Sequence, residues 1–200
     1  VFGFRFAEKT IKPPKNASTF EDGNKLVCLD GENRSVYYKA AVSGTYFAVR
    51  EKCGEKNYSV TVSKEAKEKF WARLVLNSLG VEELAARKNG FVFHSSFVKT
   101  NEKALLFTGP CGIGKSTQAK LWNTFRAAEI INGDKTLIYL EDGKVFASGL
   151  PFSGSSKVSL NEKTQLKTIV ALEKGSENKA RFLERRSAFR VLMKSAYVPF

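Results

Sequence analysis

A glycine-rich segment in the middle of the chain carries the residues best suited to bind phosphate. It fits the pattern G-x-x-x-x-G-K-[ST] without a substitution. Glycines let consecutive backbone N–H groups point at phosphate oxygens, because no Cβ stands in the way. In this pattern the lysine reaches the β- and γ-phosphates and the serine hydroxyl ligates Mg²⁺. We therefore predict a P-loop that binds ATP with Mg²⁺ through Gly109, Pro110, Cys111, Gly112, Ile113, Gly114, Lys115, Ser116 and Thr117.

A P-loop also needs a carboxylate for its metal ion, and Asp134 is the best candidate. It follows the predicted strand 129–131. If this strand is a parallel neighbour of the strand before the P-loop, its C-terminal end lies beside the phosphates. The alternative is an ordinary turn aspartate, because Asn-Gly-Asp-Lys is also a common turn sequence. His94 ends a predicted strand, where a lone histidine is either a structural residue or a catalytic one.

The elements around these residues alternate between strand and helix, which is typical of an α/β fold. The pattern predicts strands at 90–94 and 104–108, and a helix over 115–125. In that helix we expect the inward-facing side chains to be Ala119, Leu121, Trp122 and Phe125. A hairpin formed by 137–140 and 144–147 then follows at once, which argues against the commonest P-loop topology. A strand at 168–172 and a basic helix within 174–194 complete this part.

The first ninety residues have a different pattern, rich in β-branched and aromatic residues between turn signals. They predict short strands at 2–6, 25–29, 35–38 and 58–62. A helix from Ser63 to Leu79 would dock on the sheet through Phe70, Trp71, Leu74, Val75 and Leu79, and a short helix over 81–88 would follow. We therefore divide the chain into a β-rich region, 1–90, that ends in a docking helix, and a catalytic domain, 91–200.

Composition narrows the class of protein further. The chain has 200 residues, of which 42% are hydrophobic and 26% charged, as in an ordinary globular protein. No stretch is long and apolar enough for a bilayer, and three scattered cysteines indicate free thiols in the cytoplasm. The net charge of +13 is spread over both halves, which suits an anionic ligand or an acidic peptide as well as it suits nucleic acid. Because the chain starts without methionine and ends on an apolar run, we expect further residues beyond both ends.

Four motifs in a fixed order resemble the catalytic domain of the HPr kinase group. They are His94-Ser95-Ser96-Phe97-Val98, the P-loop, Ile131-Asn132-Gly133-Asp134, and Gly149-Leu150-Pro151-Phe152-Ser153-Gly154. The resemblance covers about residues 64–195 and is greatest to stand-alone bacterial relatives of HPr kinase. It implies the fold shared with ATP-dependent phosphoenolpyruvate carboxykinase, in which helices flank a mixed sheet.

What the resemblance implies is transfer of the γ-phosphoryl group of ATP to a serine hydroxyl in a peptide or protein. Lys115 would hold the phosphates, Ser116 would bind the metal ion, and Asp134 would bind the metal ion or take the proton from the attacking hydroxyl. His94 would lie near the γ-phosphate. The chain departs from HPr kinases in three ways: Gly133 replaces one of two adjacent aspartates, Thr117 replaces a glutamate, and the glycine-rich segment that grips HPr is missing.

Two other classes of function remain open. A nucleotide-binding module without transfer activity is favoured by Gly133, which stands where an acidic residue is expected. A nucleic-acid interface is suggested by the basic segment 174–194, whose arginines alternate with apolar residues. A small-molecule carboxykinase needs a further metal-binding histidine, and His94 is the only one in the chain. The sequence assigns neither the acceptor nor an oligomeric state.

Overall fold

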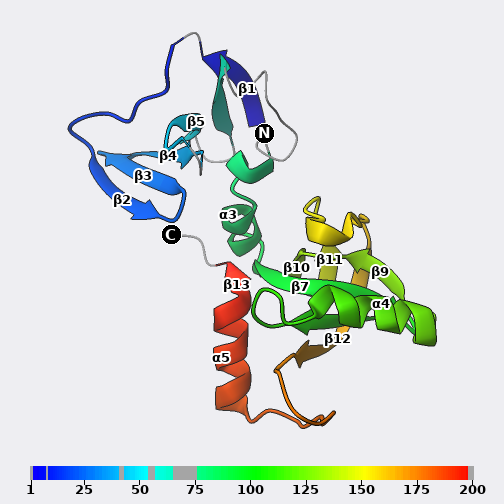
Figure 1. Ribbon diagram of the computed structural model, residues 1–200. Coiled ribbons are helices and arrows are strands. Elements are labelled where there is room, and N and C mark those ends of the chain that lie inside the picture. The colour runs from blue at the N-terminus through cyan, green and yellow to red at the C-terminus, as the bar shows by residue number, and fades with distance from the viewer. Residues whose placement is uncertain (1, 8, 41–42, 54–56, 65–75, 198–200) are drawn as a thin grey trace. The chain divides into compact units, whose positions relative to one another are not determined.

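The chain folds into two compact units, Val1–Gly80 and Val81–Phe200, and both are built on β-sheets (Figure 1). The computed structural model describes residues 2–7, 9–40, 43–53, 57–64 and 76–197. The architecture is α/β, with parallel and antiparallel strand pairs in each sheet and few helices. The division falls at Gly80 instead of near residue 90, because α3 (Val81–Ala86) packs on the first strand of the second unit.

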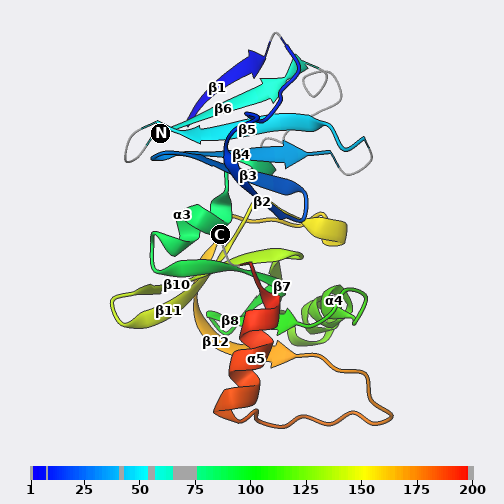
Figure 2. The same ribbon diagram turned by 90° about the vertical axis from the view of Figure 1, so that its left-hand side faces the viewer.

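The first unit holds one sheet in the order β1-β6-β5-β4-β3-β2 (Figure 2). Among the strands that the structure describes in this unit, only β1 and β6 pair in parallel. Two of its strands, β2 and β5, were not predicted from the sequence. Residues 65–75, which hold most of the predicted docking helix, lie outside the described residues. The strands are β1 (Phe2–Ala7), β2 (Ser18–Asp22), β3 (Lys25–Asp30), β4 (Asn33–Lys39), β5 (Tyr46–Lys52) and β6 (Tyr58–Ser63).

The sheet of the second unit has the order β10-β11-β12-β8-β7-β13, and β10 also pairs with β7. These pairings close a circuit of five strands around the apolar side chains of Phe93, Phe97, Leu106 and Ile138. The predicted hairpin is confirmed as β10 and β11. The strands are β7 (Gly90–Thr100), β8 (Lys103–Thr108), β9 (Glu129–Asn132), β10 (Lys135–Glu141), β11 (Lys144–Gly149), β12 (Lys163–Ala171) and β13 (Ala196–Tyr197).

The long strand β7 organises this unit, because its two halves pair with different neighbours. Its first half pairs with β10, with His94 opposite Lys135, and its second half pairs with β8, with Ser95 opposite Thr108. The expectation that β9 would be a parallel neighbour of β8 is wrong. β7 lies between the two and is antiparallel to both, while the parallel neighbour of β8 is β12. Since β8 and β9 still run in the same direction, both end at the same edge of the sheet.

The helix after the glycine-rich segment, α4 (Lys115–Arg126), packs on the sheet through a narrow stripe. Ala119 is buried, and the ring of Trp122 lies 6.1 Å from that of Phe107. The prediction that Leu121 and Phe125 also face inward is wrong, because their exposed fractions are 43% and 74%. At 100° per residue, these two side chains fall on the face of the helix opposite to Ala119.

The chain returns to the sheet at its end. The predicted basic helix is confirmed only as α5 (Arg185–Ser195), and residues 172–184 before it have no regular helix or strand. Leu192 and Ala196 pack against the core, and β13 then pairs with β7 through Phe93. Among the residues that the structure describes, no helix is both long and apolar enough to cross a bilayer.

Candidate functional site

The glycine-rich loop joins β8 to α4, and three of its glycines have backbone angles that side chains disfavour. The φ angles are 142° at Gly109, 76° at Gly112 and 109° at Gly114. A Cβ on Gly109 would also lie 3.0 Å from the carbonyl oxygen of Leu172. Only glycine adopts these angles at low cost, so the sequence pattern has a direct structural reason. The loop is therefore a tight backbone curl that ends at the start of a helix.

The first turn of α4 leaves its backbone N–H groups free for a ligand. No side chain caps the helix, because the capping position is Gly114. The first intrahelical bond is donated by the N–H of Gln118 to the carbonyl of Gly114. Free amides at a helix start, together with the helix dipole, attract an anion. Within the described residues the hydroxyl of Ser116 makes no hydrogen bond either, while Thr117 is exposed.

Lys115 folds back over the loop that precedes it. Its ammonium donates hydrogen bonds to the carbonyl oxygens of Gly109, at 2.9 Å, and Pro110, at 3.0 Å. Burial lowers the pKa of Lys115, and the charges of Cys111 and Asp134 act in the opposite direction. The ammonium group of Lys115 is therefore hydrogen-bonded to two neutral carbonyl oxygens of the loop. Negatively charged phosphate oxygens form stronger hydrogen bonds with an ammonium group and can replace them.

Asp134 is held in place by the side chain of Asn132. The Asn132 amide oxygen accepts hydrogen bonds from the backbone N–H groups of Asp134, at 2.8 Å, and Lys135, at 3.0 Å. Its amide nitrogen donates to the carbonyl of Leu150, and the residue is fully buried. The carbonyl of Asp134 in turn accepts a bond from the N–H of Ser95 on β7. This turn therefore fixes Asp134 at the end of β9 and against β7.

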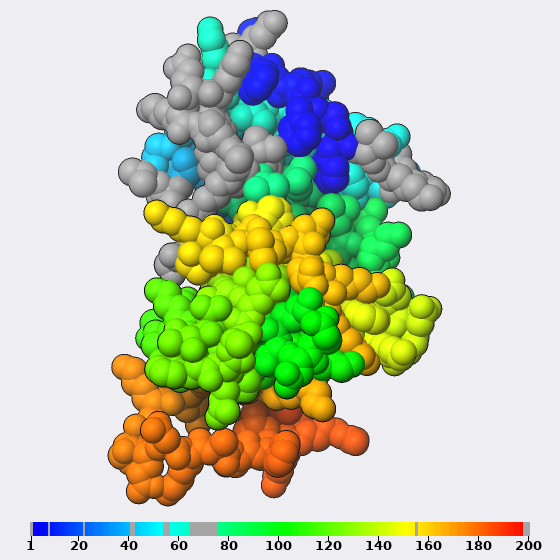
Figure 3. All heavy atoms as spheres, turned by 90° about the vertical axis from the view of Figure 1, so that its right-hand side faces the viewer, coloured from blue at the N-terminus to red at the C-terminus, as the bar shows by residue number. Residues whose placement is uncertain are grey.

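Gly133 has no room for a side chain. A Cβ at this position would lie 1.9 Å from Oγ of Ser156 and 3.0 Å from the carbonyl oxygen of Ser153. The short 3-10 helix η1 (Gly154–Ser156) occupies this space, and Gly154 lies against the side chain of Asp134. In Figure 3 this part of the chain, in yellow, lies next to the green part of the same unit. The glycine in place of an acidic residue is therefore a packing requirement of this fold.

His94 lies beside Asp134, as expected if both serve one site. Its Nδ1 is 3.4 Å from Oδ1 of Asp134 and 3.3 Å from the hydroxyl of Tyr197, whose ring meets the imidazole edge-on. Burial, and then the positive charges of Lys115 and Lys135, lower the pKa of His94, while Asp134 acts to raise it. The imidazole is therefore held in its neutral form near pH 7.

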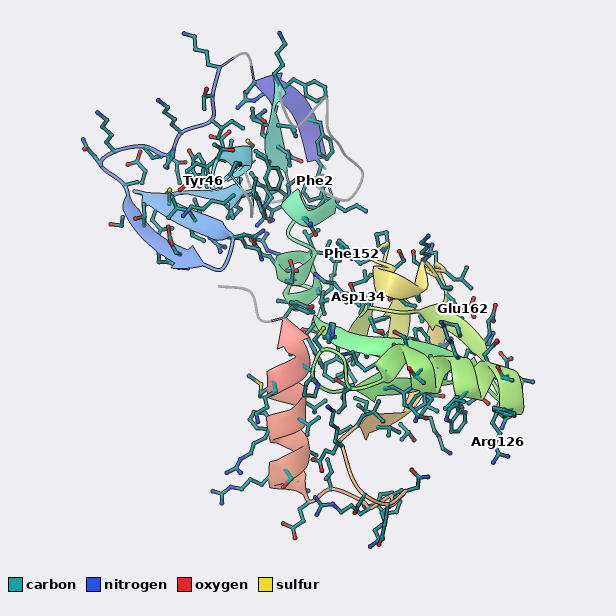
Figure 4. The ribbon with its side chains drawn as sticks, viewed as in Figure 1. Phe2, Tyr46, Arg126, Asp134, Phe152 and Glu162 are labelled. Atoms are coloured by element: carbon teal, nitrogen blue, oxygen red, sulfur yellow. The ribbon has the colours of Figure 1, made fainter. Side chains whose placement is uncertain are left out.

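Two residues near Asp134, Lys135 and Tyr197, were not predicted from the sequence as part of the site. The ammonium of Lys135 lies 4.7 Å from the ring centre of Phe152 and 4.2 Å from that of Tyr197, with a carboxylate oxygen of Glu82 at 3.7 Å. Figure 4 labels Asp134 and Phe152 at this end of the sheet. Burial raises the pKa of the Tyr197 hydroxyl, and the charges of Asp134 and Glu82 add to this. No local pattern could have indicated Tyr197, since it lies far from His94 in the chain.

The predicted site residues thus gather at one end of the sheet. The hydroxyl of Thr108, which directly precedes the loop, donates a hydrogen bond to the carbonyl of His94 at 2.9 Å, and Nδ1 of His94 lies 3.4 Å from Oδ1 of Asp134. Pro110, Cys111 and Gly112 are exposed at the tip of the loop, and Ile113 is half-buried. Among the described residues, no cluster of three His, Cys, Asp or Glu side chains could hold a metal ion by itself.

The comparisons with known proteins include a distant structural neighbour. The chain matches no protein-family model and no curated protein. Among solved structures it is similar to the HPr(Ser) kinase/phosphatase from Coxiella burnetii, with 14% sequence identity and a TM-score of 0.36. The match covers 45% of this chain and 64% of that chain, so the chain spans less than two thirds of this neighbour.

Proposed function

We propose that this protein is an ATP-dependent phosphotransferase that moves the γ-phosphoryl group to a serine hydroxyl of a peptide or protein. The observation that carries the proposal is the arrangement at one end of the sheet. There the loop Gly109–Ser116 presents free helix amides and Lys115, and it directly follows Thr108, whose hydroxyl donates a hydrogen bond to the carbonyl of His94 beside Asp134. Phosphoryl transfer needs positioning and charge neutralisation above all, and these groups provide both.

Each side chain has a distinct role in this proposal. The loop amides and Lys115 bind the β- and γ-phosphates, and Lys115 leaves the carbonyls of Gly109 and Pro110 to do so. Asp134 accepts the proton of the serine hydroxyl. The serine oxygen then forms a bond to the γ-phosphorus as the bond between this phosphorus and the bridging oxygen of ADP breaks. His94, neutral because of its lowered pKa, donates a hydrogen bond to a γ-phosphate oxygen.

The residues present also fit Mg²⁺ as the accompanying metal ion. Mg²⁺ is usually held by one or two protein oxygens together with phosphates and water, and not by a protein cage. Ser116 supplies a hydroxyl without a partner among the described residues, and Asp134 a carboxylate, while no larger metal-binding cluster is described. When bound, the ion would neutralise charge on the β- and γ-phosphate oxygens.

A second candidate is a nucleotide-binding module that performs no transfer. It is favoured by the packing at Gly133, because Ser156 fills the space that a second acidic side chain would need. At positions 133 and 134 the site then has one carboxylate, that of Asp134. Such a module would bind ATP and hold a conformation or a partner.

Calorimetric titration with ATP, with and without Mg²⁺, tests nucleotide binding. Lys115→Ala should weaken ATP binding by about tenfold to a hundredfold, since it removes charge-assisted hydrogen bonds. The matched control is Lys120→Ala, which removes an exposed lysine from the same helix and should bind like the wild type. Asp134→Asn should lose the Mg²⁺ dependence. A wild type that binds no nucleotide would refute both candidate functions.

Transfer is then measured with γ-labelled ATP and a pool of serine-containing peptides. Label on a peptide serine with the wild type, and none with Lys115→Ala or Asp134→Asn, supports the phosphotransferase. ATP binding without labelled peptide and without ADP formation supports the module instead. Because the same samples serve both measurements, the two candidates are separated without a further variant.

A further inference from the structure

Helix α5 has an exposed face on the side opposite to the one that packs on the sheet. Its inner face, formed by Ala188, Val191, Leu192 and Ser195, is half-buried on the sheet. Its outer face consists of Arg186, Phe189, Arg190 and Met193, at the spacing of one helical stripe. All four are exposed, Phe189 to 61% and Met193 to 48%. An apolar pair flanked by arginines is thus displayed to the solvent.

The charges on this helix are unbalanced. Its sequence, RRSAFRVLMKS, has four cations and no carboxylate. None of Arg185, Arg186, Arg190 and Lys194 forms an ion pair with a residue that the structure describes. Phe182, just before the helix, is also fully exposed, and Figure 3 shows the orange segment before α5 standing off the surface. Such a surface attracts an anionic partner that also has apolar groups to bury.

The end of α5 is joined directly to the candidate site. Oγ of Ser195 lies 2.8 Å from Oγ1 of Thr108, the last residue before the glycine-rich loop. Tyr197, two residues further, meets His94. The C-terminal end of α5 is therefore adjacent both to the residue that precedes the loop and to His94.

We propose that the outer face of α5 binds an acidic, partly apolar segment of the peptide or protein that carries the acceptor serine, an inference that rests on the proposed transfer to serine. Carboxylates of the segment pair with Arg186 and Arg190, and its apolar side chains cover Phe189 and Met193. A second copy of this chain is disfavoured as the occupant, since each carries a net charge of +13. Binding of nucleic acid or of a membrane would not require that α5 end next to the candidate site, whereas binding of an acceptor does.

The length of the helix sets the spacing of the acceptor. From Arg186 to Ser195 the axis rises about 14 Å, at 1.5 Å per residue. An extended peptide covers this distance in about four residues. The carboxylate that pairs with Arg186 should therefore lie at least about four residues from the serine.

The probe is a fluorescein-labelled synthetic peptide with one serine, a spacer of about four small residues and a segment of alternating glutamate and leucine. Its binding is followed by fluorescence anisotropy without nucleotide, and a peptide with glutamine in place of glutamate is the control ligand. The double variant Arg186→Glu/Arg190→Glu reverses the charge of the outer face. The control variant Lys88→Glu/Lys144→Glu makes the same change at two exposed lysines elsewhere in the unit.

The α5 variant should bind the acidic peptide at least about tenfold more weakly than the wild type, and the control variant within about twofold. Phe189→Ser should also weaken binding, while the glutamine peptide should bind poorly throughout. Equal binding by the α5 variant and the wild type would overturn the proposal. The proposal would also be overturned if the wild type bound a single-stranded RNA of equal length, or vesicles containing phosphatidylserine, more tightly than the acidic peptide and the α5 variant did not bind them.

Calorimetry on the same samples separates this inference from the proposed function. Both substitutions lie outside the glycine-rich loop, so the α5 variant should keep its ATP affinity. Loss of peptide binding in the wild type with ATP binding intact refutes the docking surface alone. Peptide binding without any ATP binding refutes the phosphotransferase alone.

Discussion

The packing of Gly133 against Ser156 allows a quantitative test of the site's architecture. In Gly133→Ala the new methyl group would lie 1.9 Å from Oγ and 2.4 Å from Cβ of Ser156, so η1 must move. Overpacking of this kind costs about 1–3 kcal/mol. The move also breaks the hydrogen bonds from Ser156 to the carbonyl of Ser153, at 2.7 Å, and from the N–H of Val158 to Ser156, at 3.1 Å. We expect the free energy of unfolding to fall by about 2–3 kcal/mol.

The assay is urea unfolding followed by the fluorescence of Trp122, in a Trp71→Phe background that leaves one tryptophan in the second unit. Ser156→Gly alone should lower the free energy of unfolding by about 1–2 kcal/mol, from its lost hydrogen bonds. In the double variant the methyl group takes the vacated space, so the loss should not exceed that of Gly133→Ala. The coupling between the two positions is then about 2 kcal/mol.

Two results would refute this reasoning. One is a change below about 0.5 kcal/mol in Gly133→Ala, which is typical of an unconstrained surface position. The other is a double variant whose loss equals the sum of the two single losses. Gly175→Ala is the control, because the nearest atom to its new methyl group, the carbonyl oxygen of Glu177, lies at 3.3 Å and needs to shift by only a few tenths of an ångström.

Two further predictions concern the neighbours of Asp134. The NMR titration of His94, the only histidine, should give a pKa below about 6.5. Asp134→Asn should lower this pKa and Lys135→Met should raise it; a wild-type pKa above 6.5 would contradict the burial argument. Since the unfolded chain then binds the proton more tightly, the free energy of unfolding should decrease as the pH falls below about 6.5. Asn132→Ala removes the acceptor of two backbone N–H groups, those of Asp134 and Lys135, and one of the two donors to the carbonyl of Leu150, which keeps its bond from the N–H of Phe152. It should reduce the free energy of unfolding by about 2–4 kcal/mol in the same urea assay, and a change under about 1 kcal/mol would refute the role given to Asn132.

Features set by neighbours in the chain could be predicted from the sequence. The strand, the glycine-rich loop and the helix α4 follow one another directly, and the positive φ angles of Gly109, Gly112 and Gly114 fall where the pattern places glycine. The hairpin of β10 and β11 was equally predictable, because its turn lies between two short apolar runs. In each case the interactions that decide the structure act over a few residues.

Features that depend on distant partners were decided by the tertiary structure. Strand β9 pairs with β7 and not with β8, because pairing follows the burial of apolar faces against strands far along the chain. The prediction that Phe125 faces inward was wrong for the same reason. Which face of α4 is buried depends on where the sheet lies, and the local sequence does not specify that.

The candidate site shows the same division. The sequence determined which chemical groups are available: the loop amides, Lys115, Asp134 and His94. Tertiary folding decided that Tyr197 meets His94 and that Ser156 leaves no space for a side chain at Gly133. The physical reason is that a local pattern specifies backbone conformation, whereas contacts between remote segments depend on how whole elements share a core.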